Sequence, residues 1–226
     1  MNQQRFFVTA TGTGVGKSFI TAALVQQAKA RGRSVAAYKP IITGYNPAQI
    51  DDSDIGLLLR SVGLEATPQN IDRMSPWRFE MPMAPSMAAP IELRYLDFEA
   101  LILHSRGAMH APQDVAFIEG VGGVMVPLDE GHTILDWISA LEMPSLLVTG
   151  SYLGTISHTL TALAAMQQRH LPIHAIIVNE SPDSPIALQD TVNELGRWTR
   201  LPIVAVSRRK SSDGWNDVKE LRGIIA

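Results

Sequence analysis

A glycine-rich segment near the start of the chain carries the residue types best suited to chemistry. Residues 10–18 read ATGTGVGKS and stand between a predicted strand and a predicted helix, the setting that a phosphate-binding loop requires. Glycines let successive N–H groups converge on phosphate oxygens, and a helix start favours anions. Lys17 can reach the outer phosphates of a nucleotide, and Ser18 can offer a hydroxyl to Mg²⁺. Although Thr11 replaces the usual Gly or Ala, this combination predicts a phosphate site rather than an ordinary glycine-rich turn.

Two acidic positions could complete a magnesium site beside that loop. Glu119 closes a predicted strand and leads into a second flexible segment, GVGG at 120–123. Mg²⁺ prefers carboxylate oxygens, so Glu119 is a candidate ligand, with a solvated acid at a strand end as the alternative. Asp54 ends the run DDSD and precedes an apolar helix. Taken alone, that position favours capping of the helix over metal binding.

Lys39 is a candidate for a second cation at the same site. It ends a predicted strand, and Pro40 then blocks any helical continuation. A lysine in such a place is commonly a surface residue. Because it would emerge at the same sheet edge as Lys17, it could also act on a transferring phosphoryl group. Thr43 and Gly44 follow directly and add a hydroxyl and accessible backbone.

Other catalytic arrangements find little support. The six histidines show no paired metal-ligand spacing, and they stand at positions 104, 110, 132, 158, 170 and 174. His158 is the least certain of them, since residues 154–158 begin a predicted helix whose start could bind an anion. The chain has no GxSxG segment and no cysteine, so nothing in it points to covalent catalysis, disulfides or iron–sulfur ligation.

Short apolar runs alternate with amphipathic stretches along the whole chain. The runs predict strands buried on both faces at 5–10, 34–40, 115–120, 145–150, 174–179 and 203–207. The predicted helices between them cover 17–31, 97–110, 155–170 and 186–199. This alternation predicts an α/β fold with a doubly wound, mostly parallel sheet, helices on both faces, and ligands at the carboxyl ends of the strands. Residues 67–96 contain five prolines and are predicted to be a long irregular insertion.

Composition sets broad limits. A chain of 226 residues with 46% hydrophobic and 18% charged residues fits one globular domain spanning 1–226. The net charge of -3 gives no basic excess for nucleic acid. We also expect no membrane partner, no signal peptide and a cytoplasmic location, because no apolar stretch is long enough to span a bilayer.

Several motifs, in this order, resemble those of the dethiobiotin synthetase family, a group of P-loop enzymes. They are FFVTATGTGVGKS, AAYKPIITG, SPWRFEMPMAPSMAA, FIEGVGGVMVPL, LLVTGSYLGTISHTLTAL and IIVNE, and they extend from about Phe6 to Asn179. The resemblance implies a Mg²⁺-dependent ligase of biotin biosynthesis that joins 7,8-diaminononanoate and CO₂, with ATP as co-substrate, to give dethiobiotin. The implied intermediates are a carbamate and a carbamic–phosphoric anhydride, and the implied assembly is a homodimer.

The resemblance also implies roles for individual residues. Those implied in catalysis are Lys17, Lys39 and Thr13, and those implied in nucleotide binding are Gly12, Thr13, Gly14, Val15, Gly16, Lys17, Ser18 and Asn179. Substrate contacts are implied for Thr43, Gly122, Gly154, Thr155 and Ser157, the helix start at 154–158 receiving the substrate carboxylate across the dimer interface. Magnesium ligands are implied at Ser18, Asp54 and Glu119.

The chain also departs from the family pattern at four places. Gly14 replaces an acidic residue, Ser86 a histidine and Ser157 an asparagine, and a Gly-x-x-Pro segment usual near the C-terminus is absent. Two alternatives therefore stay open. One is a relative that binds nucleotide without turnover. The other is a P-loop ATPase switch of the partitioning kind, although Gly12 stands where such switches carry a signature lysine.

Overall fold

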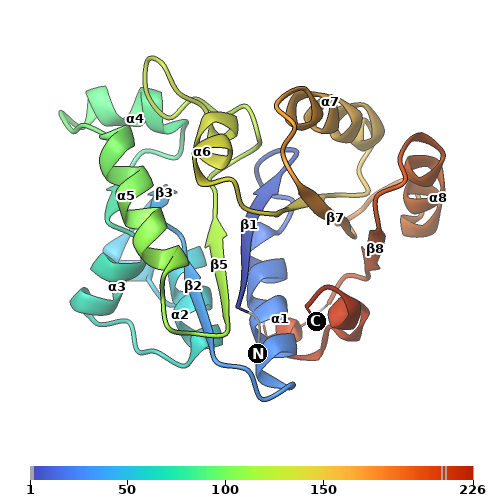
Figure 1. Ribbon diagram of the computed structural model, residues 1–226, viewed down its shortest axis with the longest axis horizontal. Helices are drawn as coiled ribbons and strands as arrows, with labels where there is room; N and C mark the ends of the chain where they lie inside the picture. Colours follow the sequence, from blue (N-terminus) through green and yellow to red (C-terminus); the bar gives the residue numbers. More distant parts are fainter. Residues whose placement is uncertain (1–2, 210, 212, 226) are drawn as a thin grey trace.

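The computed structural model describes residues 3–209, 211 and 213–225 and is built around a six-stranded parallel sheet (Figure 1). The strand order is β2-β5-β1-β6-β7-β8. The strands are β1 (Gln4–Ala10), β2 (Val35–Tyr38), β5 (Val115–Glu119), β6 (Ser145–Thr149), β7 (Ile173–Asn179) and β8 (Ile203–Val206). Their nearly continuous apolar sequences are explained by burial on both faces, and the six predicted strands are all present.

Helices cover both faces of this sheet (Figure 1). Behind it in this view lies α1 (Lys17–Lys29), and α2 (Asp54–Val62) packs beside α1. The opposite face is covered by α5 (Phe98–Met109), α6 (Ile134–Leu141), α7 (Thr155–Gln168) and α8 (Leu188–Trp198). The predicted α/β, doubly wound class is therefore confirmed. Within the described residues, no helix is both long and apolar enough to cross a membrane.

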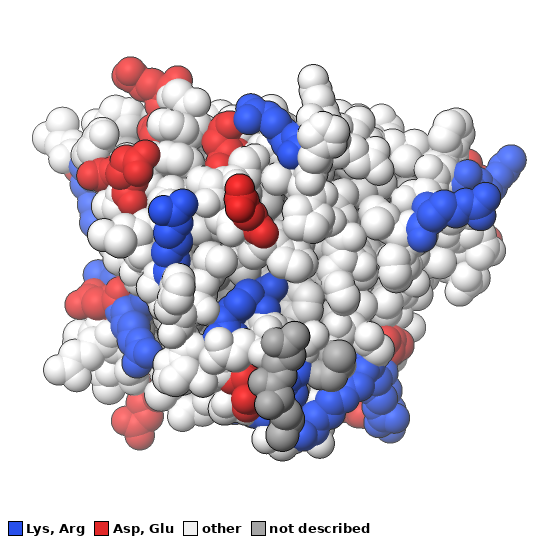
Figure 2. Space-filling view, in the orientation of Figure 1, with Lys and Arg blue, Asp and Glu red and all other residues white. Residues whose placement is uncertain are grey.

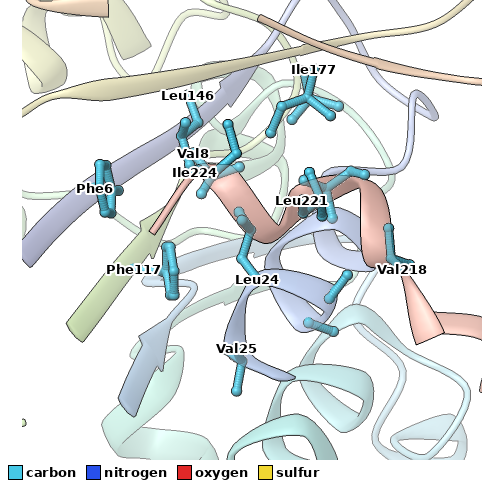
Figure 3. Close-up of a cluster of buried hydrophobic side chains, with 14 of the residues drawn as sticks. Phe6, Val8, Leu24, Val25, Phe117, Leu146, Ile177, Val218, Leu221 and Ile224 are labelled. Carbon is cyan, nitrogen blue, oxygen red and sulfur yellow. The ribbon is translucent and has the colours of Figure 1, made fainter. Parts of the chain in front are cut away.

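The core behind the sheet includes apolar side chains from residues 215–225. Two short 3₁₀ helices, η2 (Gly214–Asp217) and η3 (Lys219–Gly223), pack against α1. Figure 3 shows Val218, Leu221 and Ile224 beside Leu24 of α1. This packing holds the C-terminal segment against the helix that follows the glycine-rich loop.

The direction of the chain changes next to β1. From β1 it runs outward to the edge strand β2, whereas from β5 it passes over β1 to β6. In open α/β sheets, ligands bind outside the carboxyl ends of the strands at such a reversal. The glycine-rich loop follows β1, so the topology places it at this position.

The prediction of a long irregular insertion at 67–96 is wrong. That stretch contains α3 (Pro68–Met74), β4 (Trp77–Phe79) and α4 (Pro85–Ile91), and β4 pairs in parallel with β3 (Ile41–Thr43). Pro68 and Pro85 each stand in the first turn of a helix, where their missing N–H is not needed. Two of the five prolines therefore mark helix starts, and Pro90 lies inside α4.

Besides η2 and η3, the helical elements η1 and α6 were not predicted either. A single 3₁₀ turn, η1 (Pro47–Gln49), precedes α2. Helix α6 begins with a capping box, in which the Thr133 hydroxyl accepts from the backbone of Asp136 and the Asp136 carboxylate accepts from Thr133 N–H.

On the face seen in Figure 2, acidic and basic side chains are interspersed.

Candidate active site

The glycine-rich loop wraps from β1 into α1 in conformations that require glycine. Gly14 and Gly16 have φ of 75° and 88°, in the left-handed region that disfavours other residues. A Cβ at Gly16 would also clash with the amide of Asn179. Thr11 N–H donates to Val148 O at 3.0 Å, which fixes the start of the loop to β6. The loop and the N-terminus of α1 together form a cradle of the kind that binds phosphate.

Lys17 reaches across this cradle. Its ammonium donates to the carbonyl oxygens of Gly12 at 3.3 Å and Gly122 at 2.7 Å, so it joins the two glycine-rich segments. Burial, followed by the charge of Lys39, lowers the pKa of Lys17 to about 8. An anionic ligand in the cradle would therefore be favoured, because it would compensate a buried and repelled cation.

Glu119 is the centre of a buried polar cluster. Its carboxylate is 0% exposed, and it accepts from Ser18 Oγ at 2.6 Å and from Thr21 Oγ1 at 2.7 Å. Lys39 Nζ donates to the same carboxylate at 2.6 Å. The reading of Glu119 as a solvated surface acid is wrong, because the residue ends a central strand that is covered on both faces.

Lys39 links Glu119 to Asp54. Its ammonium lies 3.1 Å from Asp54 Oδ2, and the residue is 3% exposed. Burial alone would lower the pKa of Lys39, but the two carboxylates outweigh burial and raise it above its ordinary value. The charge of Lys39 in turn is the main cause that lowers the pKa of Asp54. The expected capping role of Asp54 is wrong, since Ser53 caps α2 through a 3.2 Å bond from Gly56 N–H.

These groups converge on one cavity of about 560 Å³. The predicted site residues that line it are Thr13, Gly14, Gly16, Lys17, Ser18, Lys39, Thr43, Asp54 and Gly122. Glu119 lies beneath them through its bonds to Ser18 and Lys39. The remaining wall is largely apolar and comes from Phe19, Ile42, Leu57, Pro82, Met83, Ala84, Val121 and Val126. The cavity thus pairs a strongly polar end with an apolar wall.

A second cavity of about 280 Å³ adjoins the other side of the loop. It is lined by Gly14, Val15, Phe19, Asn179, Glu180, Ser181, Pro182, Arg208 and Arg209. Asn179 Nδ2 donates to Val15 O at 3.0 Å, which connects the end of β7 to the loop. The C-terminal segment that departs from the family pattern borders this cavity through Arg208 and Arg209. Residues 210 and 212 of that segment lie outside the described residues.

Three predicted substrate residues, Gly154, Thr155 and Ser157, line neither cavity. They form the start of α7, where Gly154 has a φ of 100° and the Thr155 hydroxyl donates to Gly150 O at 2.8 Å. His158, also in the first turn, contacts Tyr152 OH through Nδ1 at 2.9 Å. Within the described part of this single chain, the helix start is separate from the phosphate cradle.

The donor set of the first cavity suits Mg²⁺. Ser18, Asp54 and Glu119 supply oxygen atoms, and the Lys39 ammonium already holds both carboxylates in one place. Across the described residues there is no cluster of three His, Cys, Asp or Glu side chains. Such a set fits a Mg²⁺ ion that is bound by few protein groups and also by nucleotide phosphates.

Comparisons with known proteins agree with this geometry. A family model described as an AAA domain matches residues 4–210. ATP-dependent dethiobiotin synthetase of Acidiphilium cryptum (strain JF-5) is 39% identical over 193 residues, which are 85% of this chain and 86% of that protein. The chain belongs to the dethiobiotin synthetase family. The same enzyme of Caulobacter vibrioides (strain NA1000 / CB15N) is 45% identical over 181 residues, covering 79% of this chain and 81% of that protein.

Solved structures support the fold of this family member. The MinC:MinD cell division protein complex of Aquifex aeolicus matches with a TM-score of 0.59 and 12% identity, covering 94% of this chain and 84% of that one. A ParA family ATPase from Chlorobium tepidum TLS matches with a TM-score of 0.52 and 16% identity, covering 94% and 86%. At these identities the likeness concerns the P-loop fold alone.

Sequence reasoning missed two parts of the candidate site. Thr21 is the second hydroxyl donor to Glu119, and its signal was a polar residue three positions after Ser18 on the buried side of α1. The apolar wall from residues 82–84 was missed because that stretch was expected to be irregular. Its place over the cavity depends on the pairing of β3 with β4.

Proposed function

We propose that this chain is an ATP- and Mg²⁺-dependent ligase that converts 7,8-diaminononanoate and CO₂ to dethiobiotin. The family relationship and the cavity around Lys17 support this assignment together. ATP would occupy the cradle with its phosphates, and the base would lie toward Asn179. Ser18, Asp54 and Glu119 would hold Mg²⁺, which neutralises phosphate charge when it is bound.

In the proposed reaction, one substrate amine bonds to CO₂ and releases a proton to give a carbamate. A carbamate oxygen then attacks the γ-phosphorus, and ADP leaves with the bond electrons. The second amine attacks the carbonyl carbon of this mixed anhydride, so that the ureido ring closes and phosphate leaves. Each step joins substrate groups to one another, and the protein therefore needs to position them and stabilise charge rather than supply a nucleophile.

The two buried lysines would perform that stabilisation. Lys17 lies at the cradle, where the transferring phosphoryl group would be, and Lys39 lines the same cavity from the end of β2. Thr13 would approach the phosphates, Gly122 would contact the substrate, and Thr43 would approach the carbamate and amines. The aliphatic part of the diamine would pack on the apolar wall, which includes Ile42 and Met83.

A homodimer is part of the proposal, because the start of α7 would receive the substrate carboxylate from across an interface. Leu153 and Met125 are 77% and 56% exposed, and further exposed apolar side chains stand at Met87, Ile91, Leu93, Tyr95 and Leu103. Surfaces of this kind favour association. Light scattering on the purified protein would give its oligomeric state.

We also propose a cytoplasmic location, where ATP is available.

One observation carries the assignment, namely that Lys17 and Lys39 line one cavity together with Ser18 and Asp54, whose oxygen atoms would bind Mg²⁺. The test supplies the protein with diaminononanoate, bicarbonate, Mg²⁺ and ATP, and detects dethiobiotin by mass spectrometry. Lys17→Ala should abolish the product. Lys29→Ala is the matched control, since Lys29 lies at the far end of the same helix and bonds Ser61 O at 2.6 Å. ATP binding by the wild type without product would instead favour a relative without turnover.

A further inference from the structure

Four threonine hydroxyls form a buried cluster between the glycine-rich loop and α7. Thr149, the last residue of β6, lies at its centre and is 0% exposed. Its Oγ1 is 3.0 Å from Thr11 Oγ1, 2.9 Å from Thr155 Oγ1 and 2.9 Å from Thr159 Oγ1. Thr11 belongs to the loop, whereas Thr155 and Thr159 lie one turn apart on α7. One side chain thus connects the phosphate cradle with the start of that helix.

Two bonds to backbone carbonyl oxygens limit which hydroxyls of this cluster can donate to Thr149. Thr155 Oγ1 donates to Gly150 O at 2.8 Å, and Thr159 Oγ1 donates to Thr155 O at 2.7 Å. Carbonyl oxygens only accept, so when both of these bonds are made neither hydroxyl donates to Thr149. In that arrangement Thr149 can donate its single proton to one of the two α7 hydroxyls while it accepts from Thr11.

The cluster consequently has one more contact than it has protons. The Thr149 proton can point to Thr155 or to Thr159, and these two arrangements are discrete alternatives. In the first, a continuous hydrogen-bonded path runs from Thr11 through Thr149 to Thr155 at the helix start. Thr149 touches the elements that carry both sites, so ordering of one of them can be transmitted through it to the other.

We propose that Thr149 is a positioning residue that couples the nucleotide loop to the substrate-carboxylate site at the start of α7. The proposal rests on the proposed function, which places ATP phosphates at the loop and, from across the dimer interface, the substrate carboxylate at 154–158. Nucleotide that orders Thr11 would hold the Thr149 hydroxyl from the loop side, and a carboxylate that orders Thr155 would hold the same hydroxyl from the helix side. Coupling of this sort is reciprocal, so each ligand should tighten the other by the same factor.

Packing alone does not explain these hydroxyls. Thr9 and Thr191 are equally buried, and within the described residues their Oγ1 atoms have no hydrogen-bond partner. The fold therefore accepts buried threonines whose hydroxyls are unpaired. Valine has nearly the same shape as threonine, so Thr149→Val removes the hydrogen bonds with little change in volume. Thr191→Val on α8 is the matched control, because it deletes a hydroxyl that bonds to nothing described.

The test measures the affinity for a non-hydrolysable ATP analogue by calorimetry, with and without diaminononanoate. We expect the diamine to tighten analogue binding by the wild type and by Thr191→Val to the same extent. In Thr149→Val this tightening should fall by about threefold to tenfold, the factor that corresponds to one neutral hydrogen bond. The KM values for both substrates should rise, whereas kcat at saturation should change little. Thr149→Ser, which keeps a hydroxyl, should restore the coupling.

The possible failures are distinguishable. Equal tightening in the wild type and in Thr149→Val, or no tightening in a wild type that binds the diamine and forms product, would overturn the coupling alone. A wild type that neither binds the diamine nor forms product would overturn the proposed function and the coupling with it. Thr149→Ala replaces the valine variant in the same measurement if the latter does not fold.

Discussion

Replacing Lys39 by methionine should destabilise the protein strongly in the absence of Mg²⁺ and nucleotide. The variant leaves Glu119, which is 0% exposed, without its cation. Removing one member of a buried ion pair typically costs about 3–5 kcal/mol. Glu119 keeps the hydroxyls of Ser18 and Thr21, and the Asp54 side chain is 51% exposed and adds little, so the lower end applies. We therefore expect a loss of about 3 kcal/mol, or roughly 6–12 °C in Tm for a chain of this size.

The assay is urea unfolding at pH 7, with Lys39→Met, Glu119→Gln and the double variant compared. The double variant removes both charges and should recover most of the loss, since a neutral amide can remain bonded to the two hydroxyls. If the unfolding free energy of Lys39→Met lies less than about 1 kcal/mol below that of the wild type, the reasoning is refuted, because a buried unpaired carboxylate cannot cost so little. A double variant that is no more stable than Lys39→Met would refute it as well.

Three further predictions concern the loop and the fold. Because burial and then the charge of Lys39 lower the pKa of Lys17 to about 8, ATP binding near pH 9 should take up a proton. Calorimetry in two buffers of different ionisation enthalpy would detect that uptake, and Lys17→Met should lack it. Gly16→Ala should weaken ATP binding about fivefold to thirtyfold, since positive φ alone costs roughly 1–2 kcal/mol, whereas Gly107→Ala on α5, which meets open space, should bind normally in the same titration. Asp136→Ala should cost about 1 kcal/mol at pH 7 in thermal unfolding. Burial raises the pKa of Asp136, but its hydrogen bonds to Thr133 outweigh burial and leave the pKa below its ordinary value. The stability difference between Asp136→Ala and wild type should therefore disappear as the pH falls below about 4.

The sheet could be predicted from the sequence because its strands are buried on both faces. A run such as Val115–Glu119, with five buried residues in succession, has no other common explanation at that length. The order of the strands could not be predicted in the same way. It depends on which crossovers run toward β2 and which toward β8, and the local sequence does not record that choice.

The error at 67–96 came from reading prolines as interruptions of structure. Pro68 follows Thr67, whose hydroxyl accepts from Asn70 N–H at 3.3 Å, so this pair is a helix start. The strand β4 has only three residues and pairs with a strand of equal length. Such short elements owe their stability to tertiary packing, and their own sequences therefore predict them poorly.

The strand order also decides what Lys39 and Glu119 are. Each residue, considered alone, stands at a strand end where a solvated charge is the ordinary outcome. In the sheet, β2 and β5 are neighbours, and Tyr38 pairs with Ile118. Lys39 follows Tyr38, and Glu119 follows Ile118. The two charges therefore lie side by side below the loop. Neither residue's role follows from its own surroundings in the sequence. The register of two strands about 80 positions apart turns two ambiguous charges into one buried pair, and that pair holds the candidate magnesium ligands in place before any ligand binds.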